Sequence, residues 1–273
     1  MSLAVLYSRS LAGMDAPLVT VEAHLANGLP SFTIVGLPEV EVKESKDRVR
    51  AALQNARFEF PARRITINLA PADLPKESGR FDLPIALGIL AASGQLPNER
   101  LTDYEFAGEL ALTGELRPIR GTLAMMYGAS RDGRAFVVPH LNGPEAALVE
   151  GAKVYAARNL LEVCAHLAGR EQMALCREVP DIKSEPVPDL ADVKGQAQAK
   201  RALEVAAAGE HSLIMVGPPG SGKTMLATRL AGILPQMTQD EAFRAAAIQS
   251  LGRAGFDLRN WRRRPFRSPP HTA

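Results

Sequence analysis

Residues 217–224 constrain this chain most, because they read Gly-Pro-Pro-Gly-Ser-Gly-Lys-Thr and directly follow an apolar run at residues 213–216. This spacing is that of a phosphate-binding loop that joins a strand to a helix. Its glycines allow successive backbone N–H groups to converge on phosphate oxygens. The sequence therefore predicts a strand at 213–216, a phosphate loop, and a helix that begins near Gly222, rather than an ordinary turn rich in glycine and proline.

The polar residues of this phosphate loop have distinct chemical roles. Lys223 is placed to reach the β- and γ-phosphates of a nucleoside triphosphate, and the Thr224 hydroxyl is placed to bind Mg²⁺. The positive end of the helix dipole adds to the attraction for an anion. ATP and Mg²⁺ are therefore the predicted ligands. The predicted nucleotide-binding residues are Gly217, Pro218, Pro219, Gly220, Ser221, Gly222, Lys223 and Thr224, with Thr224 as the metal ligand.

Length and patterning predict two domains of mixed α/β structure. The 273 residues, 46% of them hydrophobic, are enough to form two cores. A stretch rich in proline and charge predicts a linker at 171–190, between a domain at 1–170 and a domain at 191–273. Strands are predicted at 4–7, 18–25, 32–35, 65–69, 106–112, 115–118, 135–138 and 153–156, and helices at 40–56, 84–92, 144–150, 159–167 and 197–208.

The sequence indicates a cytoplasmic protein. Its two cysteines, Cys164 and Cys176, form no C-x-x-C pair, which favours a reducing compartment over a disulfide or metal framework. The start lacks the basic region of a signal peptide, and the apolar runs are too short to span a bilayer. No membrane partner is expected.

Positive charge gathers near the end of the sequence. Residues 251–273 hold six arginines and one acid, Asp257, which gives this stretch a charge of +5 within a chain of net charge +2. Arginines beside aromatic residues suit contacts with a phosphate backbone and stacking on bases. The alternative is a solvated basic loop, or an interface that pairs with acids of a neighbouring subunit. The predicted DNA contacts are Arg262, Arg263, Arg264 and Arg267.

Several longer stretches are distinctive when they are taken together. They are Asn27-Gly-Leu-Pro, Ile34-Val-Gly-Leu-Pro, Val42-Lys-Glu-Ser-Lys-Asp-Arg-Val, residues 60–76 and Arg80-Phe-Asp-Leu-Pro-Ile-Ala-Leu-Gly-Ile-Leu. The set resembles the ComM/YifB family of magnesium-chelatase-like AAA+ ATPases, and the resemblance covers essentially the whole chain. Residues 265–273 also match a family stretch, although Pro270 stands where the family usually has histidine, which weakens any role for that turn.

This resemblance implies an α/β fold with a Lon-like first domain, of the ribosomal-S5-domain-2 type, followed by the start of a P-loop AAA+ domain. It also implies that Val193 and Lys194 pack against the adenine base; the alternative is that Val193 is simply a core residue. The family's activity implies a hexameric, ATP-driven DNA helicase, which promotes branch migration on single-stranded or branched DNA during recombination in natural transformation.

The Lon relationship raises a rival interpretation, a Ser–Lys peptidase. Such an enzyme needs a nucleophilic serine beside a lysine that can lose its proton. The position where Lon-like enzymes carry the nucleophile corresponds to Phe81 or Asp82, and Ser78 lies too early, in an expected turn. The first domain is therefore expected to be a non-proteolytic relative.

Family members continue beyond the last residue of this sequence, through the Walker B acid, the sensors and the arginine finger, none of which it contains. A fragment or an interrupted gene is expected, with little or no ATPase activity, because phosphoryl transfer depends on those positioned charges. The sequence thus leaves open whether the chain is an enzyme. Two alternatives are a magnesium-chelatase motor subunit acting on porphyrin, which the Lon-like domain disfavours, and an inactive nucleotide-binding or interaction protein.

Overall fold

The computed structural model describes residues 2–12, 15–177, 187–250, 252 and 256–267. The chain forms two compact units, Met1–Pro180 with Ala247–Gly255, and Asp181–Ala246 with Phe256–Ala273. The linker expected at 171–190 stays a prediction, and two of the prolines that suggested it, Pro180 and Pro186, lie outside the described residues.

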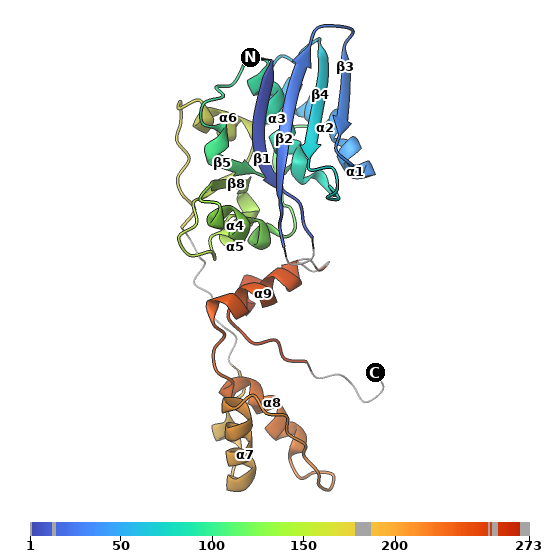
Figure 1. The fold of residues 1–273 in the computed structure, drawn as a ribbon. Helices are drawn as coiled ribbons and strands as arrows, with labels where there is room; N and C mark the ends of the chain where they lie inside the picture. Colours follow the sequence, from blue (N-terminus) through green and yellow to red (C-terminus); the bar gives the residue numbers. More distant parts are fainter. Residues whose placement is uncertain (1, 13–14, 178–186, 251, 253–255, 268–273) are drawn as a thin grey trace. The chain divides into compact units, whose positions relative to one another are not determined.

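A seven-stranded mixed sheet forms the first unit (Figure 1). Its strand order is β3-β4-β2-β1-β5-β8-β9. The β1–β2 and β2–β4 pairs are antiparallel, whereas the β3–β4, β1–β5, β5–β8 and β8–β9 pairs are parallel. The strands are β1 (Leu3–Arg9), β2 (Leu18–Ala26), β3 (Ser31–Val35), β4 (Arg64–Ala70), β5 (Tyr104–Phe106), β8 (Ala135–Pro139) and β9 (Val154–Ala157).

The alternation of residue types decides which face of the antiparallel strands meets the core. In β2, Val19, Val21, Ala23 and Leu25 are buried, and the residues between them are more exposed. Successive side chains of a strand point to opposite faces, so a period of two produces one buried face. The parallel strand β8 is instead buried along its whole length, as expected of a strand covered on both faces.

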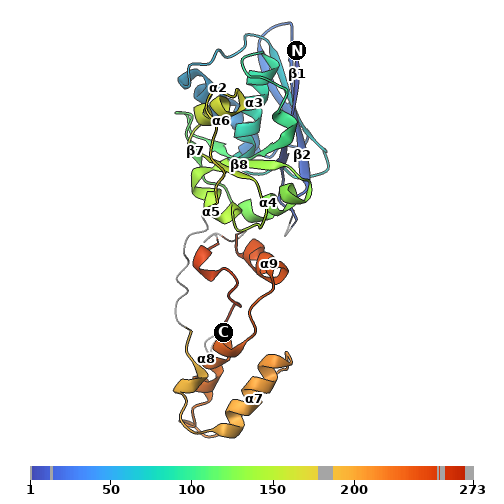
Figure 2. The ribbon, with the colours of Figure 1, turned by 90° about the vertical axis from the view of Figure 1, so that its left-hand side faces the viewer.

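Helices pack on this sheet, and α2, α3 and α6 lie to one side of β1 and β2 (Figure 2). Contacts join α3 to β1 and β2, α2 to α3, α4 to β8, and α5 to β9. Among the described residues, no helix has the length and apolarity needed to cross a bilayer. The helices are α1 (Val40–Lys43), α2 (Ser45–Asn55), α3 (Asp82–Ala92), α4 (Thr122–Arg131), α5 (Gly143–Ala146) and α6 (Leu160–Leu167), with 3₁₀ turns at Gly79–Phe81, Leu101–Asp103 and His140–Asn142.

A hydrogen-bonded carboxylate fixes the start of α3. Asp82 is fully buried, and its carboxylate accepts hydrogen bonds from the Ser45 hydroxyl, from Arg48 Nε at 2.7 Å and from the Leu110 N–H at 3.2 Å. A buried charge is tolerated when it is paired and hydrogen-bonded in this way. Asp82 therefore ties α3 to α2 and to the hairpin formed by β6 (Glu109–Leu110) and β7 (Leu116–Arg117).

A second buried ion pair joins β1 to β5. Arg9 donates from Nε and Nη2 to the two Glu105 oxygens at 2.6 and 2.8 Å. The same guanidinium also pairs with Asp132 and donates from Nη1 to the Ala16 carbonyl at 2.8 Å. The bidentate arrangement matches the fork of the guanidinium to the carboxylate and restricts how the two strands can align.

The structure confirms the predicted strands of the first unit except the one at 106–112, and it changes several other elements. The helix expected at 40–56 is interrupted at Glu44, between α1 and α2. The hairpin at Thr113-Gly114 forms from β6 and β7, while Phe106, expected to be part of it, is the last residue of β5 and belongs to the main sheet. The helix expected at 144–150 shortens to α5, and α4 was not predicted.

The second unit contains α7 (Ala197–Ala208), which has the bounds that the sequence predicts, and α8 (Lys223–Ile233). These helices contact each other, and Leu190, Val193, Leu203 and Leu226 form a small buried core. Short 3₁₀ turns occupy Leu190–Asp192 and Leu258–Asn260. A further helix, α9 (Gln239–Ser250), whose residues from Ala247 on are counted with the first unit, was not predicted.

The strand predicted at residues 213–216 is wrong. These residues form no strand, and the side chains of Ile214 and Val216 are 87% and 90% exposed. A parallel strand is stable when neighbouring strands pair with its backbone and both faces are covered. Among the described residues of the second unit there is no other strand to provide that pairing.

Replacement of Gly88 by valine should destabilise the first unit. A Cβ at Gly88 would lie 2.9 Å from Ala23 Cβ and 3.1 Å from Leu6 Cδ1, so a larger side chain must push α3 away from β1 and β2. Overpacking of this kind costs about 1–3 kcal/mol in the free energy of unfolding. Urea unfolding followed by circular dichroism measures this change. The control is Gln54→Val at an exposed position of α2, and an equal loss in both variants would contradict the close-packing argument.

Candidate functional site

The phosphate loop takes the backbone conformation for which its glycines are suited. Gly220 and Gly222 have φ angles of +81° and +84°, in the left-handed region that glycine adopts most easily. The Ser221 N–H donates to the Pro218 carbonyl at 3.4 Å, and the Ser221 hydroxyl donates to the same carbonyl at 2.9 Å. Gly222 immediately precedes α8, so the helix begins where the sequence predicts.

Lys223 folds back over this loop. Its Nζ donates to the carbonyls of Gly217 and Pro218, both at 2.8 Å, and lies 3.4 Å from the Ser221 hydroxyl. These acceptors are neutral, and an anionic oxygen attracts an ammonium group more strongly than a neutral carbonyl does. The lysine is therefore positioned to exchange its contacts with the loop for contacts with phosphate oxygens.

The start of α8 fits an anion and a metal ion. No side chain caps this helix, so its first N–H groups have no partner from a capping residue. Those N–H groups and the positive end of the helix dipole favour phosphate oxygens. Thr224 lies in the first turn and is exposed, which leaves its hydroxyl accessible to Mg²⁺ bound by those phosphates. The described residues thus fit a magnesium–triphosphate group.

One further residue supports the loop, although sequence reasoning gave it no part in the site. Gln196, which has a φ of +55° just before α7, donates from Nε2 to the Ser221 carbonyl at 3.1 Å. Arg229, in the second turn of α8, lies 3.4 Å from an Asp192 oxygen and donates to the Met225 carbonyl, and its Nε is buried with no partner among the described residues. The position of Gln196 at a helix start, before a phosphate-loop motif, is the signal that could have indicated its role.

Val193 and Lys194, the residues predicted to meet adenine, lie in different environments. Val193 is 5% exposed and packs in the small core with Leu203 and Leu226, whereas Lys194 is exposed. Burial of Val193 agrees with the alternative assigned to it, a core residue. The adenine contact stays a prediction for both residues.

Part of the arginine segment, residues 259–267, is already paired with acids. Arg259 contacts Asp257 at 2.7 Å, and Arg264 contacts Glu241 at 3.3 Å and donates to the Pro235 carbonyl at 2.7 Å. The other predicted DNA contacts are half-buried Arg263 and exposed Arg262 and Arg267. Two residues of the same stretch, Arg253 and Pro270, lie outside the described residues.

The arginine segment lines a cavity of about 400 Å³ in the second unit. Arg259, Arg262, Arg263, Arg264 and Trp261 contribute to its wall. The Trp261 ring meets the Phe243 ring edge-on, with the centroids 5.3 Å apart, so this aromatic group already packs within the protein. The cavity gathers cationic side chains, and its chemistry suits an anion more than a stacked base.

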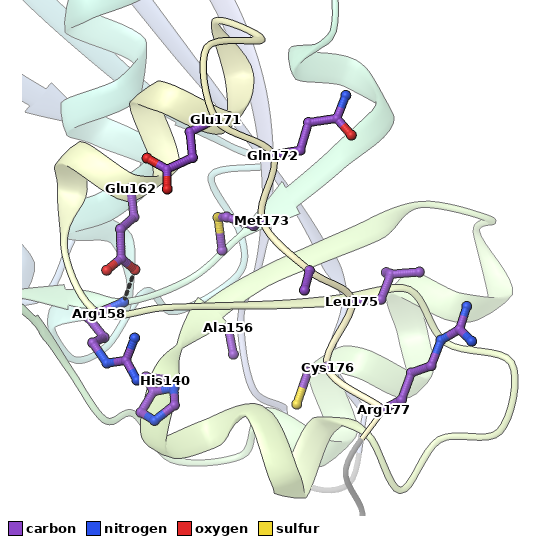
Figure 3. A pocket seen from close by; sticks show the side chains of 11 residues that line it. His140, Ala156, Arg158, Glu162, Glu171, Gln172, Met173, Leu175, Cys176 and Arg177 are labelled. Carbon is purple, nitrogen blue, oxygen red and sulfur yellow. Dashed lines mark hydrogen bonds between the residues drawn. The ribbon is translucent and has the colours of Figure 1, made fainter.

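A cavity of about 420 Å³ in the first unit carried no sequence signal (Figure 3). Glu162, Arg158 and His140 lie on one side of it, and the segment after α6 lies on the other, with Cys176 on that segment. The Cys176 N–H donates to the Val154 carbonyl at 2.8 Å, so this segment runs along the edge strand β9. Burial raises the pKa of the Cys164 thiol to about 12.

The Lon-like stretch does not assemble a serine–lysine pair. Phe81 and Asp82, the residues predicted to occupy the nucleophile position of Lon-like enzymes, are fully buried. Lys76 is also buried, and its ammonium donates to a backbone carbonyl, that of Pro71. The Ser78 hydroxyl accepts a 2.9 Å hydrogen bond from Arg80 Nε. Within the described residues no hydrogen bond joins a lysine side chain to Ser78.

The fold and the loop together define a protein with a Lon-like α/β domain followed by the start of a P-loop AAA+ domain. Models of subunit ChlI of magnesium chelatase match residues 21–142 and 189–273. The chain is also 28% identical to Lon protease 2 of Thermus thermophilus over 138 residues, which are 48% of this chain and 17% of that protein.

The chain belongs to the ComM/YifB family of magnesium-chelatase-like proteins. It is 52% identical over 278 residues to competence protein ComM of Haemophilus influenzae, a match that covers 100% of this chain and 55% of the relative. It is 49% identical over 273 residues to the uncharacterized protein YifB of Escherichia coli, again with 100% of this chain and 54% of the relative covered. The chain thus spans about half the length of these relatives, and the predicted family is confirmed.

His166 holds the segment that lines the cavity of Figure 3. The side chain is buried, and its Nδ1 accepts a 3.1 Å hydrogen bond from the Met173 N–H. The neutral ring then carries its proton on Nε2, which lies 3.1 Å from the Tyr104 hydroxyl oxygen. Burial, aided by the positive charge of Arg100, lowers the pKa of His166 below its ordinary value of 6.5. The folded chain therefore favours neutral histidine.

Lowering the pH should therefore destabilise the folded chain relative to the unfolded chain, because His166 is favoured in its neutral form when folded. Between the ordinary pKa of about 6.5 and the lower folded value, the unfolded chain takes up a proton that the folded chain refuses, so stability falls as the pH decreases. His166→Gln, which retains an acceptor for the Met173 N–H, should lose less stability between pH 7.5 and pH 5.5. Urea unfolding at both pH values measures the difference. Equal losses in the two proteins would show that another group causes the acid sensitivity.

Proposed function

We propose that this chain is the nucleotide-binding part of an ATP-driven motor that works on DNA. The observation that carries the proposal is the phosphate loop at the start of α8, with Lys223 and Thr224 in the first turn. The loop N–H groups would hold the phosphates, Lys223 would neutralise their charge, and the Thr224 hydroxyl would bind Mg²⁺. When bound, Mg²⁺ supplies charge neutralisation of the phosphate oxygens.

Family membership supports the wider role. A relative that is 52% identical to this chain over 278 matched residues is named a competence protein. We infer a homohexameric ring that acts on single-stranded or branched DNA during recombination and transformation, in the cytoplasm. The proposed division of labour is a first domain at 1–170, a linker at 171–190 and the motor at 191–273. The buried Phe81 and Asp82 support a first domain that is not a peptidase.

Lys223→Ala should weaken nucleotide binding without unfolding the chain. Its Nζ contacts only atoms of its own loop among the described residues, so the fold does not depend on it. Loss of a charge-assisted hydrogen bond worth about 1.5–3 kcal/mol should raise the Kd for fluorescent ATP with Mg²⁺ about tenfold or more. Fluorescence titration measures this constant.

A matched control is Lys200→Ala in α7, which removes a lysine from the same unit but outside the loop. Its Kd should equal that of the unchanged chain. If Lys223→Ala binds nucleotide normally, or if the unchanged chain binds none, the nucleotide-binding proposal fails.

The arginine segment should contact the phosphate backbone of DNA. Arg263 and Arg267 are the positions to test, since Arg264 is held by Glu241. The double variant Arg263→Gln, Arg267→Gln should bind labelled single-stranded DNA more weakly, and the slope of log affinity against log salt should fall by about one for each lost phosphate contact. Fluorescence anisotropy at several salt concentrations measures the slope. Arg259→Gln, at a side chain paired with Asp257, is the control and should change the slope little.

Two alternative functions remain testable in the same assays. The match to models of subunit ChlI of magnesium chelatase favours a chelatase-type motor subunit, which would respond to chelatase partners and porphyrin rather than to DNA. An inactive nucleotide-binding or interaction protein would bind nucleotide without any response to either. A shift in nucleotide affinity when DNA is added distinguishes the DNA motor from both alternatives.

A further inference from the structure

A cavity of about 770 Å³ lies in the first unit, which does not contain the phosphate loop. One part of its wall is the segment from Glu77 to Arg80, which enters the 3₁₀ turn before α3. Another part is the loop at 118–120, which precedes α4. Its lining is mostly polar or charged and consists of Leu11, Glu41, Glu77, Ser78, Arg80, Glu109, Pro118, Ile119 and Arg120. Its volume is within the range of small-ligand sites, about 300–1,000 Å³.

Arg80 lies at the buried side of this cavity without an acidic partner. The residue is 5% exposed, yet no carboxylate of the described residues lies within 4.0 Å of its guanidinium. Its side chain donates from Nε to the Ser78 hydroxyl at 2.9 Å, and Nη1 contacts the Met125 sulfur at 3.9 Å. Hydroxyl and thioether are weak partners for a full positive charge.

The other buried arginine of the first unit shows what a compensated site looks like. Arg9 is equally buried, but it contacts two carboxylates, those of Glu105 and Asp132, and a backbone carbonyl. A buried charge is costly unless it is paired and hydrogen-bonded. The burial of Arg80 without a carboxylate partner therefore needs an explanation. Burial lowers the pKa of Arg80 to about 10, so the group is still positively charged at neutral pH.

Acidic residues line the cavity beside Arg80. Glu41, Glu77 and Glu109 are all part of its wall, and Glu41 and Glu77 are exposed or nearly so. Glu41 is fixed in direction, because it accepts a 3.0 Å hydrogen bond from the Ser78 N–H. Ser78 has a φ of +63°, so this contact holds a backbone conformation that serine seldom adopts. The cavity therefore combines a buried cation, Arg80, and an exposed cation, Arg120, with three acids.

We propose that this cavity binds a zwitterionic ligand, with a carboxylate on Arg80 and an ammonium group among the glutamates. A guanidinium pairs with a carboxylate through two parallel hydrogen bonds, which would supply the acidic partner that Arg80 lacks. An amino acid and the carboxyl end of a peptide that carries lysine share this chemistry, and the volume accommodates either. The proposal does not depend on nucleotide or DNA binding.

Ligand-observed NMR with the whole chain tests the proposal. The probes are glycyl-glycyl-lysine, the same tripeptide with an amidated carboxyl end, and free lysine. The acid form should bind, and amidation should weaken binding about tenfold or more, because it removes the charge that Arg80 would recognise. Binding of free lysine as well supports an amino acid as the natural source, and binding of the tripeptide alone supports a peptide end. Equal binding of acid and amide, or no binding of any probe, overturns the proposal.

Arg80→Met separates ligand recognition from a structural role. The variant should lose the preference for the acid over the amide, while Arg170→Met, at an exposed arginine of the same unit, should keep it. Because Arg80 has no acidic partner, the thermal unfolding midpoint of Arg80→Met should stay the same or rise. Arg9→Met should lower the midpoint, because the buried Glu105 would keep only Arg134 as a charged partner. If Arg80→Met lowers the midpoint as much as Arg9→Met does, Arg80 is structural and the proposal fails. Lys223→Ala should bind the tripeptide normally, which keeps this test independent of the nucleotide site.

Discussion

The first unit depends on the burial of α3, a helix whose eleven residues are all withdrawn from solvent. A helix that is apolar on every face must be covered on every face, and here the sheet and α2 supply that cover. The cover leaves little space, since the backbone at Gly88 meets β1 and β2 directly. The same burial places the first residue of α3, Asp82, inside the protein. Its charge then requires the Ser45 hydroxyl, Arg48 and the Leu110 N–H, which brings the segments that carry them to fixed positions.

The buried charged groups of this unit differ in how many hydrogen-bond and ion-pair partners the chain gives them. Asp82 and the Arg9–Glu105 pair are enclosed by donors and acceptors from the chain itself. Arg80, which lies two residues before Asp82, is just as buried but has the weaker contacts of a serine hydroxyl and a methionine sulfur. Buried charges whose partners all come from the chain help to specify a single fold. A buried charge that lacks an acidic partner and lies beside a cavity is more typical of a binding site.

In the second unit, the phosphate loop is formed by local contacts, whereas the apolar residues before it have no neighbouring strand among the described residues. The turn at Gly220 and Gly222 forms from short-range contacts, and Lys223 closes it by binding carbonyls of the same loop. The apolar residues before the loop have no such local support. Ile214 and Val216 are exposed because a strand needs hydrogen bonds from other strands, and the described part of this unit contains none. The loop geometry is therefore present although the strand that precedes it is not.

The sequence predicted the elements whose signal is local. The alternating pattern of β2 and the helical pattern of α7 predicted the bounds of these elements closely, because both periods can be recognised from residues that are neighbours in sequence. It missed α4 and α9, and it joined α1 to α2, because nothing in their own residues marks those boundaries strongly. For the site, it predicted the loop and its lysine but gave no role in the loop to Gln196, whose contact with Ser221 joins residues distant in sequence.

What the sequence determined by itself is the phosphate-loop turn with its helix start, the family and the alternating strands, since each of these depends on residue types at fixed short spacings. Tertiary structure decided which charged groups are paired. It placed Glu105 against Arg9, ninety-six residues away, and it placed Arg80 beside a cavity instead of beside an acid. It also left residues 213–216 outside any sheet. The physical reason is that pairing, burial and strand formation each require a partner, and the partner is brought close by the fold of the whole chain rather than by adjacent residues.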